Sequence, residues 1–524
     1  MRSLPANSPR REGDAAPAAV RLPPFERFAL PNGLQVVVCR RAQLPLASVE
    51  LLLEVGGAHD PAGKAGLASM TASLLRRGTE NRSADEIHQA IEYVGGHLDT
   101  HAGPDATTVS AGVTSENLAL ALELVADVAL HPAFPKKEFD TQQRRTLAEL
   151  AQELDEPGVV GDRVMLRTVL PAGHPYALPT AGTRVGVAAL RRADLQRFHR
   201  TFYVPGRATL IVVGDVDPAE VRRLARRFFG GWEAREAPVV EAPAPAPLRR
   251  NRILVVHKEQ ATQVQVRFVA PAFARKTDPI YFPATVANVA FGGGFTSRLV
   301  DEIRVNRGLS YNANTRFLQL RGAGFFVFKS FTKNESVGEL LQVLLDQAEK
   351  ARRGGFDEAE IERARSYLAG LYPLRLETND QIAAALGEML LYDLPTDWVE
   401  RYRANLAAVT VQQANEAARA HFFPGPCGIV LVGDRKAIEA GLSQAGIEGE
   451  VAAVPIARLD EAIERAWVTG GARRGAPRAS SAPPRGSSPR AMRGSSAAAA
   501  PASRRRKRTP SRSGRGRSRP ARGR

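Results

Sequence analysis

Arg304 and Tyr311 lie seven residues apart in this 524-residue sequence, and both side chains can donate hydrogen bonds. An arginine can donate hydrogen bonds to peptide carbonyls or stabilise a developing oxyanion, and a phenol supplies a second donor. The alternative interpretation is that Arg304 is a solvated cation at a helix end and that Tyr311 is a core aromatic. The two interpretations differ in whether the pair binds substrate.

The triplet Gly292-Gly293-Gly294 precedes this pair. Glycine-rich turns can hold a phosphate, but no Gly-Lys-Ser or Gly-Lys-Thr follows here, so we do not expect a nucleotide site. Two interpretations stay open. The triplet is either a glycine-rich loop with a role in binding or a tight connection between two helices.

The nine histidines offer one metal-like pattern. His97 and His101 are four residues apart with Asp99 between them, and residues at this spacing share a face of a helix or of a strand. Two ligands without a positioned third and fourth make a weak site, so we expect at most a secondary metal contact. His174, in a Gly-His-Pro-Tyr segment, is expected to be a turn residue and not a catalyst.

The chain that must position these residues is duplicated. Residues 203–206 and 210–215 recur as residues 422–425 and 429–434, and a Pro, two Gly and an Asp all repeat at one offset of 219 residues. A constant offset of this length indicates paired domains and not a solenoid. The Pro- and Ala-rich residues 237–247 lie between the copies and are interpreted as a linker.

Each half is expected to combine strands with helices. Apolar and alternating runs in the first half predict strands at 34–38, 47–55 and 107–110 and helices at 65–77, 115–130 and 136–153. Ser83 and Glu86 form a capping box for a further helix that ends near Val94. The second half gives strands near 253–256 and 264–269 and helices near 279–290, 336–352 and 357–368. Strands mixed with helical hairpins predict two α+β sandwich domains.

The segment from Gly66 to Ser73 (Gly-Leu-Ala-Ser-Met-Thr-Ala-Ser) resembles the opening of the insulinase and pitrilysin family of zinc peptidases. In that family it reads Gly-Leu-Ala-His-x-x-Glu-His, where two imidazoles bind zinc and the Glu takes a proton from the metal-bound water. The matching positions here are Ser69, Ala72 and Ser73, and Glu149 falls at the third ligand. Serine is a poor zinc ligand, alanine cannot act as a base, and one carboxylate does not hold catalytic zinc. We therefore expect no metal in this chain. The serines lack an activating base and are not expected to be nucleophiles.

The resemblance covers roughly residues 24–445 and includes the block from Gly292 to Tyr311. In the family, an Arg and a Tyr seven residues later help to bind peptide near the zinc, and the matching residues here are Arg304 and Tyr311. The glycine triplet lies where the non-catalytic subunit of mitochondrial processing peptidase carries a longer glycine-rich loop.

A processing-peptidase-like, non-catalytic subunit of a heterodimer is therefore implied. Its partner would be a catalytic paralogue with an intact His-x-x-Glu-His, and that partner would hold the zinc for cleavage of peptide substrates. The alternative is a scaffold or assembly subunit without a proteolytic role, similar to the family's core subunits in the respiratory cytochrome complex.

The net charge of +17 is confined to the end of the chain. Of the 72 Lys and Arg residues, seventeen lie in residues 471–524, which contain no Asp or Glu, so the body has 55 basic and 55 acidic residues. Such a tail, rich in Ser, Pro, Ala and Gly, is expected to be disordered. Arg-rich tails attract polyanions, so weak polyanion binding and a nucleic-acid-binding role form a third interpretation. The tail has no interleaved aromatic residue to stack on bases.

Compartment and domain limits complete the prediction. Residues 1–20 contain no apolar run of signal-peptide length, and no stretch approaches the length of a membrane span. We expect a cytoplasmic protein, or a periplasmic one if the true start lies upstream. Cys39 and Cys427 match no metal or redox spacing. The predicted segments are a disordered start (1–23), a first peptidase-like domain (24–236), a linker (237–250), a second peptidase-like domain (251–450), a transition segment (451–470) and a disordered basic tail (471–524).

Overall fold

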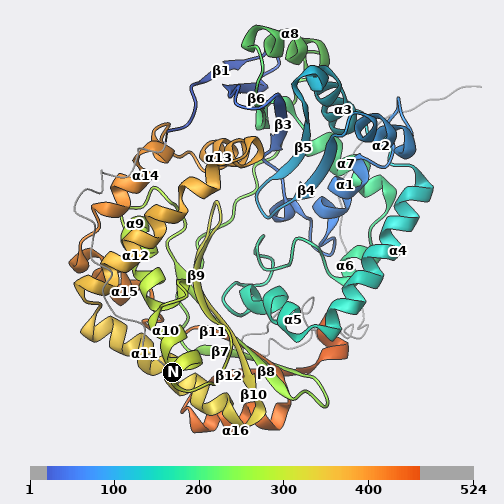
Figure 1. Ribbon diagram of the computed structural model, residues 1–524. Coiled ribbons are helices and arrows are strands. Elements are labelled where there is room, and N and C mark those ends of the chain that lie inside the picture. Colours follow the sequence, from blue (N-terminus) through green and yellow to red (C-terminus); the bar gives the residue numbers. More distant parts are fainter. Residues whose placement is uncertain (1–20, 461–524) are drawn as a thin grey trace, which may run out of the picture. The chain divides into compact units, whose positions relative to one another are not determined.

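The computed structural model describes residues 21–460. Each half of this part of the chain forms a six-stranded sheet flanked by helices (Figure 1), which confirms the predicted pair of α+β domains. The predicted disordered start, up to residue 20, and the basic tail with its predicted polyanion binding lie outside the described residues.

The first sheet has the strand order β1-β2-β6-β3-β5-β4. Its strands are β1 (Phe25–Ala29), β2 (Gln35–Arg40), β3 (Leu46–Leu53), β4 (His97–Ala102), β5 (Thr107–Thr114) and β6 (Ala208–Gly214). The helices of this half are α1 (Leu67–Leu75), α2 (Ala84–Tyr93), α3 (Leu118–Leu130), α4 (Lys136–Gln152), α5 (Pro157–Val164), α6 (Arg184–Ala188), α7 (Arg192–Phe202) and α8 (Pro218–Phe229).

The second sheet has the order β12-β7-β11-β8-β10-β9. Its strands are β7 (Asn251–His257), β8 (Gln263–Ala272), β9 (Ala313–Gln319), β10 (Gly324–Lys333), β11 (Gly428–Gly433) and β12 (Gly449–Pro455). The helices of this half are α9 (Tyr281–Asn288), α10 (Arg298–Val300), α11 (Val337–Gly354), α12 (Glu358–Leu371), α13 (Asn379–Leu391), α14 (Trp398–Ala407), α15 (Val411–His421) and α16 (Arg435–Gln444).

The two sheets repeat one topology. In each, the strand that ends the 219-residue repeat, β6 or β11, lies parallel to the first long strand of its half and antiparallel to the next one. They differ at one edge, where β1 runs antiparallel to β2 but β12 runs parallel to β7. The duplication inferred from the sequence is thus present in the strand pairing.

Each sheet is covered on both faces, and one covering helix comes from the other half. One face of the first sheet packs with α3 and α8 in its own hydrophobic core. Its other face, through Ile211 and Val213, shares a core with Ile382 of α13, and α13 lies beside β3 in Figure 1. Reciprocally, Val160 of α5 packs against the second sheet. Two sheets with both faces apolar need this exchange, because each half's own helices cover only one face.

Local signals placed the predicted helices and strands within a few residues of their observed bounds. The capping box of α2 is present, since the Ser83 hydroxyl accepts from the Glu86 amide and the Glu86 carboxylate accepts from the Ser83 amide. The helix predicted at 279–290 is an α-helix only to Asn288 and continues as the π-helical turn η6 (Val289–Gly293). No helix or strand occurs at 237–250, but the predicted domain limits stay predictions.

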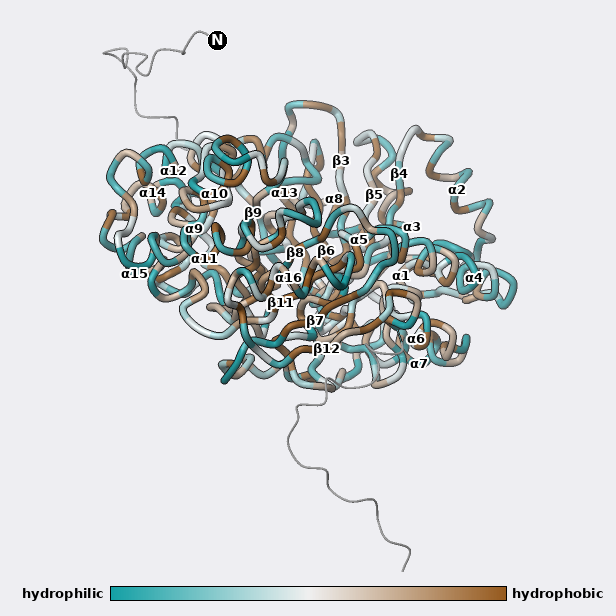
Figure 2. Tube along the Cα trace, turned by 90° about the horizontal axis from the view of Figure 1, so that it is seen from below, coloured by the Kyte–Doolittle hydropathy of each residue, from teal (hydrophilic) through white to brown (hydrophobic). Residues whose placement is uncertain are grey.

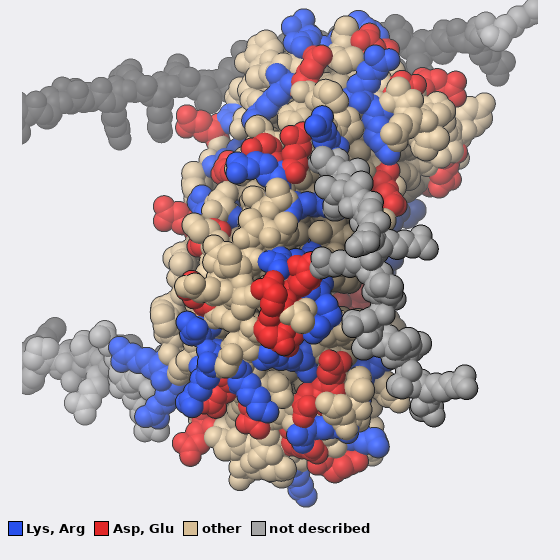
Figure 3. Space-filling view, turned by 60° about the vertical axis from the view of Figure 1, so that its left-hand side comes forward, with Lys and Arg blue, Asp and Glu red and all other residues tan. Residues whose placement is uncertain are grey.

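The placement of apolar and charged residues in the fold agrees with the composition of the chain. In Figure 2 the trace is hydrophobic along the central strands β7 and β11 and hydrophilic along α4. The face in Figure 3 carries both acidic and basic side chains, as expected for a body with equal numbers of each. Between residues 21 and 460, the structure contains no helix with the length and apolar character needed to span a bilayer.

Candidate functional site

Helix α1 carries the positions where the resemblance expects zinc ligands. Gly66, at φ +99°, precedes the helix, and this left-handed conformation favours glycine. The Asp60 carboxylate accepts hydrogen bonds from the amides of Gly66 (2.7 Å) and Ala68 (2.8 Å), which satisfies the first turn of the helix. The start of α1 is therefore fixed by a side chain from outside the helix.

Ser69, Ala72 and Ser73 share one face of α1, because residues three and four apart are neighbours on a helix. The Ser73 hydroxyl donates to the Ser69 carbonyl oxygen at 2.9 Å, and Ala72 is buried. This face of α1 presents two neutral hydroxyls, one of which already donates a hydrogen bond to the helix backbone. It presents no carboxylate that could accept a proton.

Helix α4 packs against α1, so the structure does bring Glu149 to the neighbouring helix. Its carboxylate is exposed and accepts from Nε of Arg145 at 2.8 Å. Throughout residues 21–460, no group of three or more His, Cys, Asp or Glu side chains could hold a metal ion. Two hydroxyls and an ion-paired carboxylate do not fit catalytic zinc, which takes three protein ligands.

His97 and His101 lie on β4, the edge strand of the first sheet, and both are exposed. The ring of His97 lies over Gly112 of β5, where a Cβ would come within 2.3 Å of it. Asp99 between them pairs with Arg76 at 3.3 Å. The carboxylate nearest to the two imidazoles in sequence is thus engaged by a cation, which leaves the predicted metal contact without a third ligand.

His174 is the turn residue that the sequence predicts. Its Nε2 lies 2.8 Å from the Pro243 carbonyl oxygen, and its Nδ1 accepts from the Tyr176 amide at 3.1 Å. Both ring nitrogens are used within the fold, so this histidine holds residues 173–176 against the segment that joins the two halves.

Arg304 and Tyr311 lie in an exposed segment of the second half. Arg304 belongs to the π-helical turn η7 (Asp301–Asn306), and its guanidinium carbon lies 4.8 Å from the ring centroid of Phe295. Phe295 is 73% exposed and Tyr311 is 85% exposed. The interpretation of Tyr311 as a core aromatic is therefore wrong. Turn η7 is short and follows α10 directly, and π-helical turns are frequent at functional sites.

The backbone that carries these side chains is anchored. Ile303 is fully buried, and its carbonyl accepts from the Leu309 amide at 2.8 Å. The Thr332 hydroxyl donates to the Leu309 carbonyl at 2.7 Å, and the Ser310 hydroxyl donates to the Asn312 carbonyl at 3.0 Å. An anchored segment thus presents the exposed Tyr311 ring and the Arg304 cation, residue types that are enriched at contact surfaces.

The glycine triplet is closely packed. A Cβ on Gly292 would lie 2.6 Å from the Thr315 hydroxyl, one on Gly293 would lie 2.5 Å from the Asn288 side chain, and one on Gly294 would lie 2.9 Å from the Val289 carbonyl. Contacts of this kind require glycine, so the turn between α9 and α10 is a tight connection. A further role in binding stays a prediction.

Phe295, directly after the triplet, is a site residue that sequence reasoning missed. Its ring stacks on Arg304, and it lines a cavity of about 270 Å³ that Arg363 and Tyr367 of α12 also line. Cation–π contact is worth about 0.5–1 kcal/mol at an exposed site, enough to orient a guanidinium. The only signal in the sequence is an aromatic residue next to three glycines.

Comparisons with known proteins agree with this architecture. Residues 35–183 match the family model described as Insulinase (Peptidase family M16), and residues 189–368 match the model described as Peptidase M16 inactive domain.

Two curated relatives named uncharacterized zinc protease are similar over most of their length. The protein from Mycobacterium leprae is 31% identical over 415 residues (78% of this chain, 91% of the relative). The one from Mycobacterium tuberculosis is 30% identical over 425 residues (81% of this chain, 96% of the relative).

A crystal structure of a peptidase M16 inactive domain from Pseudomonas fluorescens has a TM-score of 0.73 and 25% identity, covering 78% of this chain and 98% of that one. Both halves of the fold and nearly the whole length of the relatives are thus accounted for, and the chain belongs to the insulinase family of peptidases, family M16.

Proposed function

We propose that this chain is the non-catalytic subunit of a two-subunit peptidase of family M16, and that Arg304 and Tyr311 contact the peptide at the partner's zinc site. The observation that carries the proposal is the exposed, anchored segment with Tyr311 at 85% exposure and Arg304 stacked on Phe295. Exposed aromatic rings beside an arginine are typical of binding surfaces.

The residue types on α1 support the assignment of cleavage to the partner subunit. Ser69, Ala72 and Ser73 supply neither a zinc-binding set nor a carboxylate base, so cleavage would depend on a second chain. That chain is a catalytic paralogue with an intact His-x-x-Glu-His, and it holds the zinc. The arginine of this chain would donate to carbonyl oxygens of the bound peptide, and the phenol would supply a second donor.

Cleavage by the mixed subunits tests the roles of the two residues. With the paralogue and a peptide substrate, Arg304→Ala should lower kcat/KM on the order of 100-fold if it stabilises developing charge, and Tyr311→Phe should lower it less. The Tyr311 hydroxyl has no partner among residues 21–460, so its removal should leave the melting temperature unchanged. Arg353→Ala is the matched control, because Arg353 is an exposed arginine on α11 paired with Glu349.

Size-exclusion chromatography of the same mixtures separates loss of contact from loss of assembly. Full activity in both the Arg304→Ala and Tyr311→Phe complexes would refute the peptide-contact role and favour a scaffold subunit. The isolated chain should bind zinc at background level and cleave nothing. Stoichiometric zinc together with cleavage by this chain alone would overturn the non-catalytic assignment.

A further inference from the structure

A second cavity, of about 670 Å³, lies between the first sheet and helices of the second half. Glu50 and Leu52 of β3 line one side of it. Most of the other lining residues come from α9, α13, α14 and the turn η9 (Pro373–Leu376). Ligand cavities typically have volumes of about 300–1,000 Å³, so this one has room for a small organic molecule.

Glu50 brings an unpaired carboxyl group to this cavity. The residue is mostly buried, and its carboxylate has no hydrogen-bond or ion-pair partner within the described part of the chain. Burial and, to a smaller extent, the nearby carboxylate of Asp380 at the start of α13 together raise the pKa of Glu50 to about 7. A Cβ on Gly387 would lie 3.0 Å from Oε1 of Glu50, so a glycine on α13 makes room for this side chain.

The equivalent position in the second sheet carries an ionisable side chain that has the oppositely charged partner that Glu50 lacks. Glu50 pairs in register with Ile211 of β6, and Arg267 pairs with Val430 of β11, which is Ile211 displaced by the 219-residue offset. Arg267 is buried more deeply than Glu50, but the helix packed on its sheet supplies Asp162, whose Oδ1 accepts from Nε of Arg267 at 2.6 Å. Helix α13 supplies no cation to Glu50.

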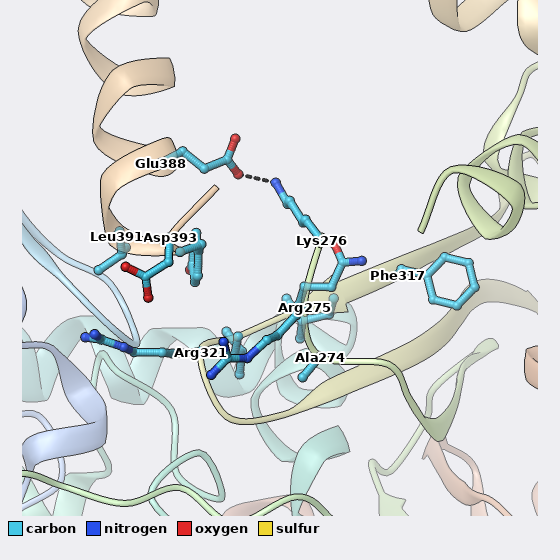
Figure 4. Close-up of a pocket in the computed structure, with 12 residues that line it drawn as sticks. Ala274, Arg275, Lys276, Phe317, Arg321, Glu388, Leu391 and Asp393 are labelled. Atoms are coloured by element: carbon cyan, nitrogen blue, oxygen red, sulfur yellow. Dashed lines mark hydrogen bonds and ion pairs between the residues drawn. The ribbon is translucent and has the colours of Figure 1, made fainter. Parts of the chain in front are cut away.

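The basic groups around the cavity are already engaged or solvated. Lys276 also lines it, but its ammonium points to Glu388 and pairs with that carboxylate, as Figure 4 shows for the adjoining cavity of about 240 Å³. Arg375 of η9 is exposed, so solvent screens its charge. The negative charge of Glu50 is therefore left for a ligand to compensate.

Aromatic rings form much of the remaining wall. The rings of Tyr372 and Tyr402 stack with centroids 4.1 Å apart, and Trp398 lies 5.4 Å from Tyr281. All four rings line the cavity. Aromatic faces attract cations, and an aromatic wall with a carboxylate is the usual recognition chemistry for ammonium and guanidinium groups.

We propose that this cavity binds a small organic cation, an alkylammonium or alkylguanidinium group, with its charge on the Glu50 carboxylate and its aliphatic part against the tyrosine and tryptophan rings. The site is separate from Arg304 and Tyr311, and it needs neither a metal nor a second chain. A free amine and a basic peptide side chain carry the same chemistry, so the test includes both.

Titration calorimetry on the full chain tests the role of charge. At pH 8.5, n-butylguanidinium should bind at least tenfold more tightly than n-butylurea, which has nearly the same shape and no charge. N-acetyl-arginine amide, measured alongside, distinguishes a free cation from a basic peptide side chain as the source. Equal affinity for the charged and neutral compounds would overturn the proposal.

Variants locate the binding at Glu50. Glu50→Gln keeps the volume and removes the charge, and Gly387→Ala places a methyl against Oε1; each should weaken butylguanidinium binding at least tenfold. Glu220→Gln, at an exposed position on α8, is the matched control and should bind as the unaltered chain does. Unchanged affinity in Glu50→Gln would refute the site. If that variant failed to fold, Gly387→Ala and the butylurea comparison would still decide.

Proton release gives an independent readout. Because binding a cation favours the ionised carboxylate, complex formation at pH 6 should release close to one proton, and at pH 8.5 almost none. Calorimetry in two buffers of different ionisation enthalpy measures this number. Binding with no proton release at pH 6 would exclude Glu50 as the counter-charge.

Discussion

Asp162→Asn should lower the free energy of unfolding by about 2–3 kcal/mol. Asp162 of α5 accepts from Nε of Arg267 at 2.6 Å and from Nζ of Lys329 at 2.7 Å, and the side chain of Arg267 is only 7% exposed. Removing one partner of a buried ion pair costs about 3–5 kcal/mol. Because the Asp162 side chain is 41% exposed, solvent screens part of this interaction, and we take the smaller figure.

Urea denaturation followed by tryptophan fluorescence at pH 7 measures this loss. The matched control is Glu149→Gln, which breaks the exposed pair with Arg145 and should cost about 0.5 kcal/mol or less. A loss below about 1 kcal/mol in Asp162→Asn, or one no larger than the control's, would show that Arg267 does not depend on this carboxylate for its charge balance.

The same variant has a defined pH dependence. Burial alone would raise the pKa of Asp162, but Arg267 and Lys329 hold it below its ordinary value. A depressed pKa in the folded state gives stability that is present above the unfolded-state value of about 3.9 and is lost as the pH falls through the folded-state value. The difference between the unaltered chain and Asp162→Asn should be constant from pH 5 to 8 and shrink below pH 4. A difference that grew on acidification would contradict the reasoning.

Two further predictions concern the first half. The double variant Ser69→Ala/Ser73→Ala should leave partner-supported cleavage unchanged and alter the melting temperature little, because only one hydrogen bond from a hydroxyl to the helix backbone is lost. A clear fall in kcat/KM would show that these positions contribute to the active site. Asp105→Asn should lower the free energy of unfolding, measured by urea denaturation, by about 1–3 kcal/mol, because the buried carboxylate accepts hydrogen bonds from the Tyr392 hydroxyl (3.3 Å) and the Arg321 amide (3.0 Å). An unaltered denaturation midpoint would refute that role.

Local chemistry explains how much of the fold the sequence predicts. The structure contains three features that the sequence predicts. The capping box at Ser83 and the apolar run of β3 depend on neighbouring residues, and the 219-residue repeat is a pattern that can be read directly from the sequence. The exchange of α5 and α13 between the halves was not predictable, because it depends on which face of each sheet remains uncovered. The π-helical turn η6 was also missed, because close contacts of the glycine triplet, such as that of Gly292 with Thr315, are not visible in the sequence.

Residue types predict one part of the candidate site, and the other part depends on the folded structure. The residue types at Ser69, Ala72 and Ser73 already indicate what α1 lacks, since no packing can convert a hydroxyl into an imidazole. Whether Tyr311 faces solvent is a property of the folded chain, and two interpretations of it stayed open until its exposure was known. Phe295 needed the structure entirely, because its contact with Arg304 joins residues on either side of α10.

The two copies of the fold have diverged in how they compensate charge at one equivalent position. Each sheet places an ionisable side chain under a helix from the other half, the buried Arg267 under α5 and the partly buried Glu50 under α13. Only α5 carries the matching opposite charge, and a buried unpaired charge costs several kcal/mol, which disfavours keeping one without a use. At Glu50 that cost is reduced by the raised pKa and would be offset by a bound cation. If Glu50→Gln melted at the same temperature as the unaltered chain at pH 8.5 and bound butylguanidinium equally well, the glutamate would have neither a cost nor a use, and the divergence would need another cause.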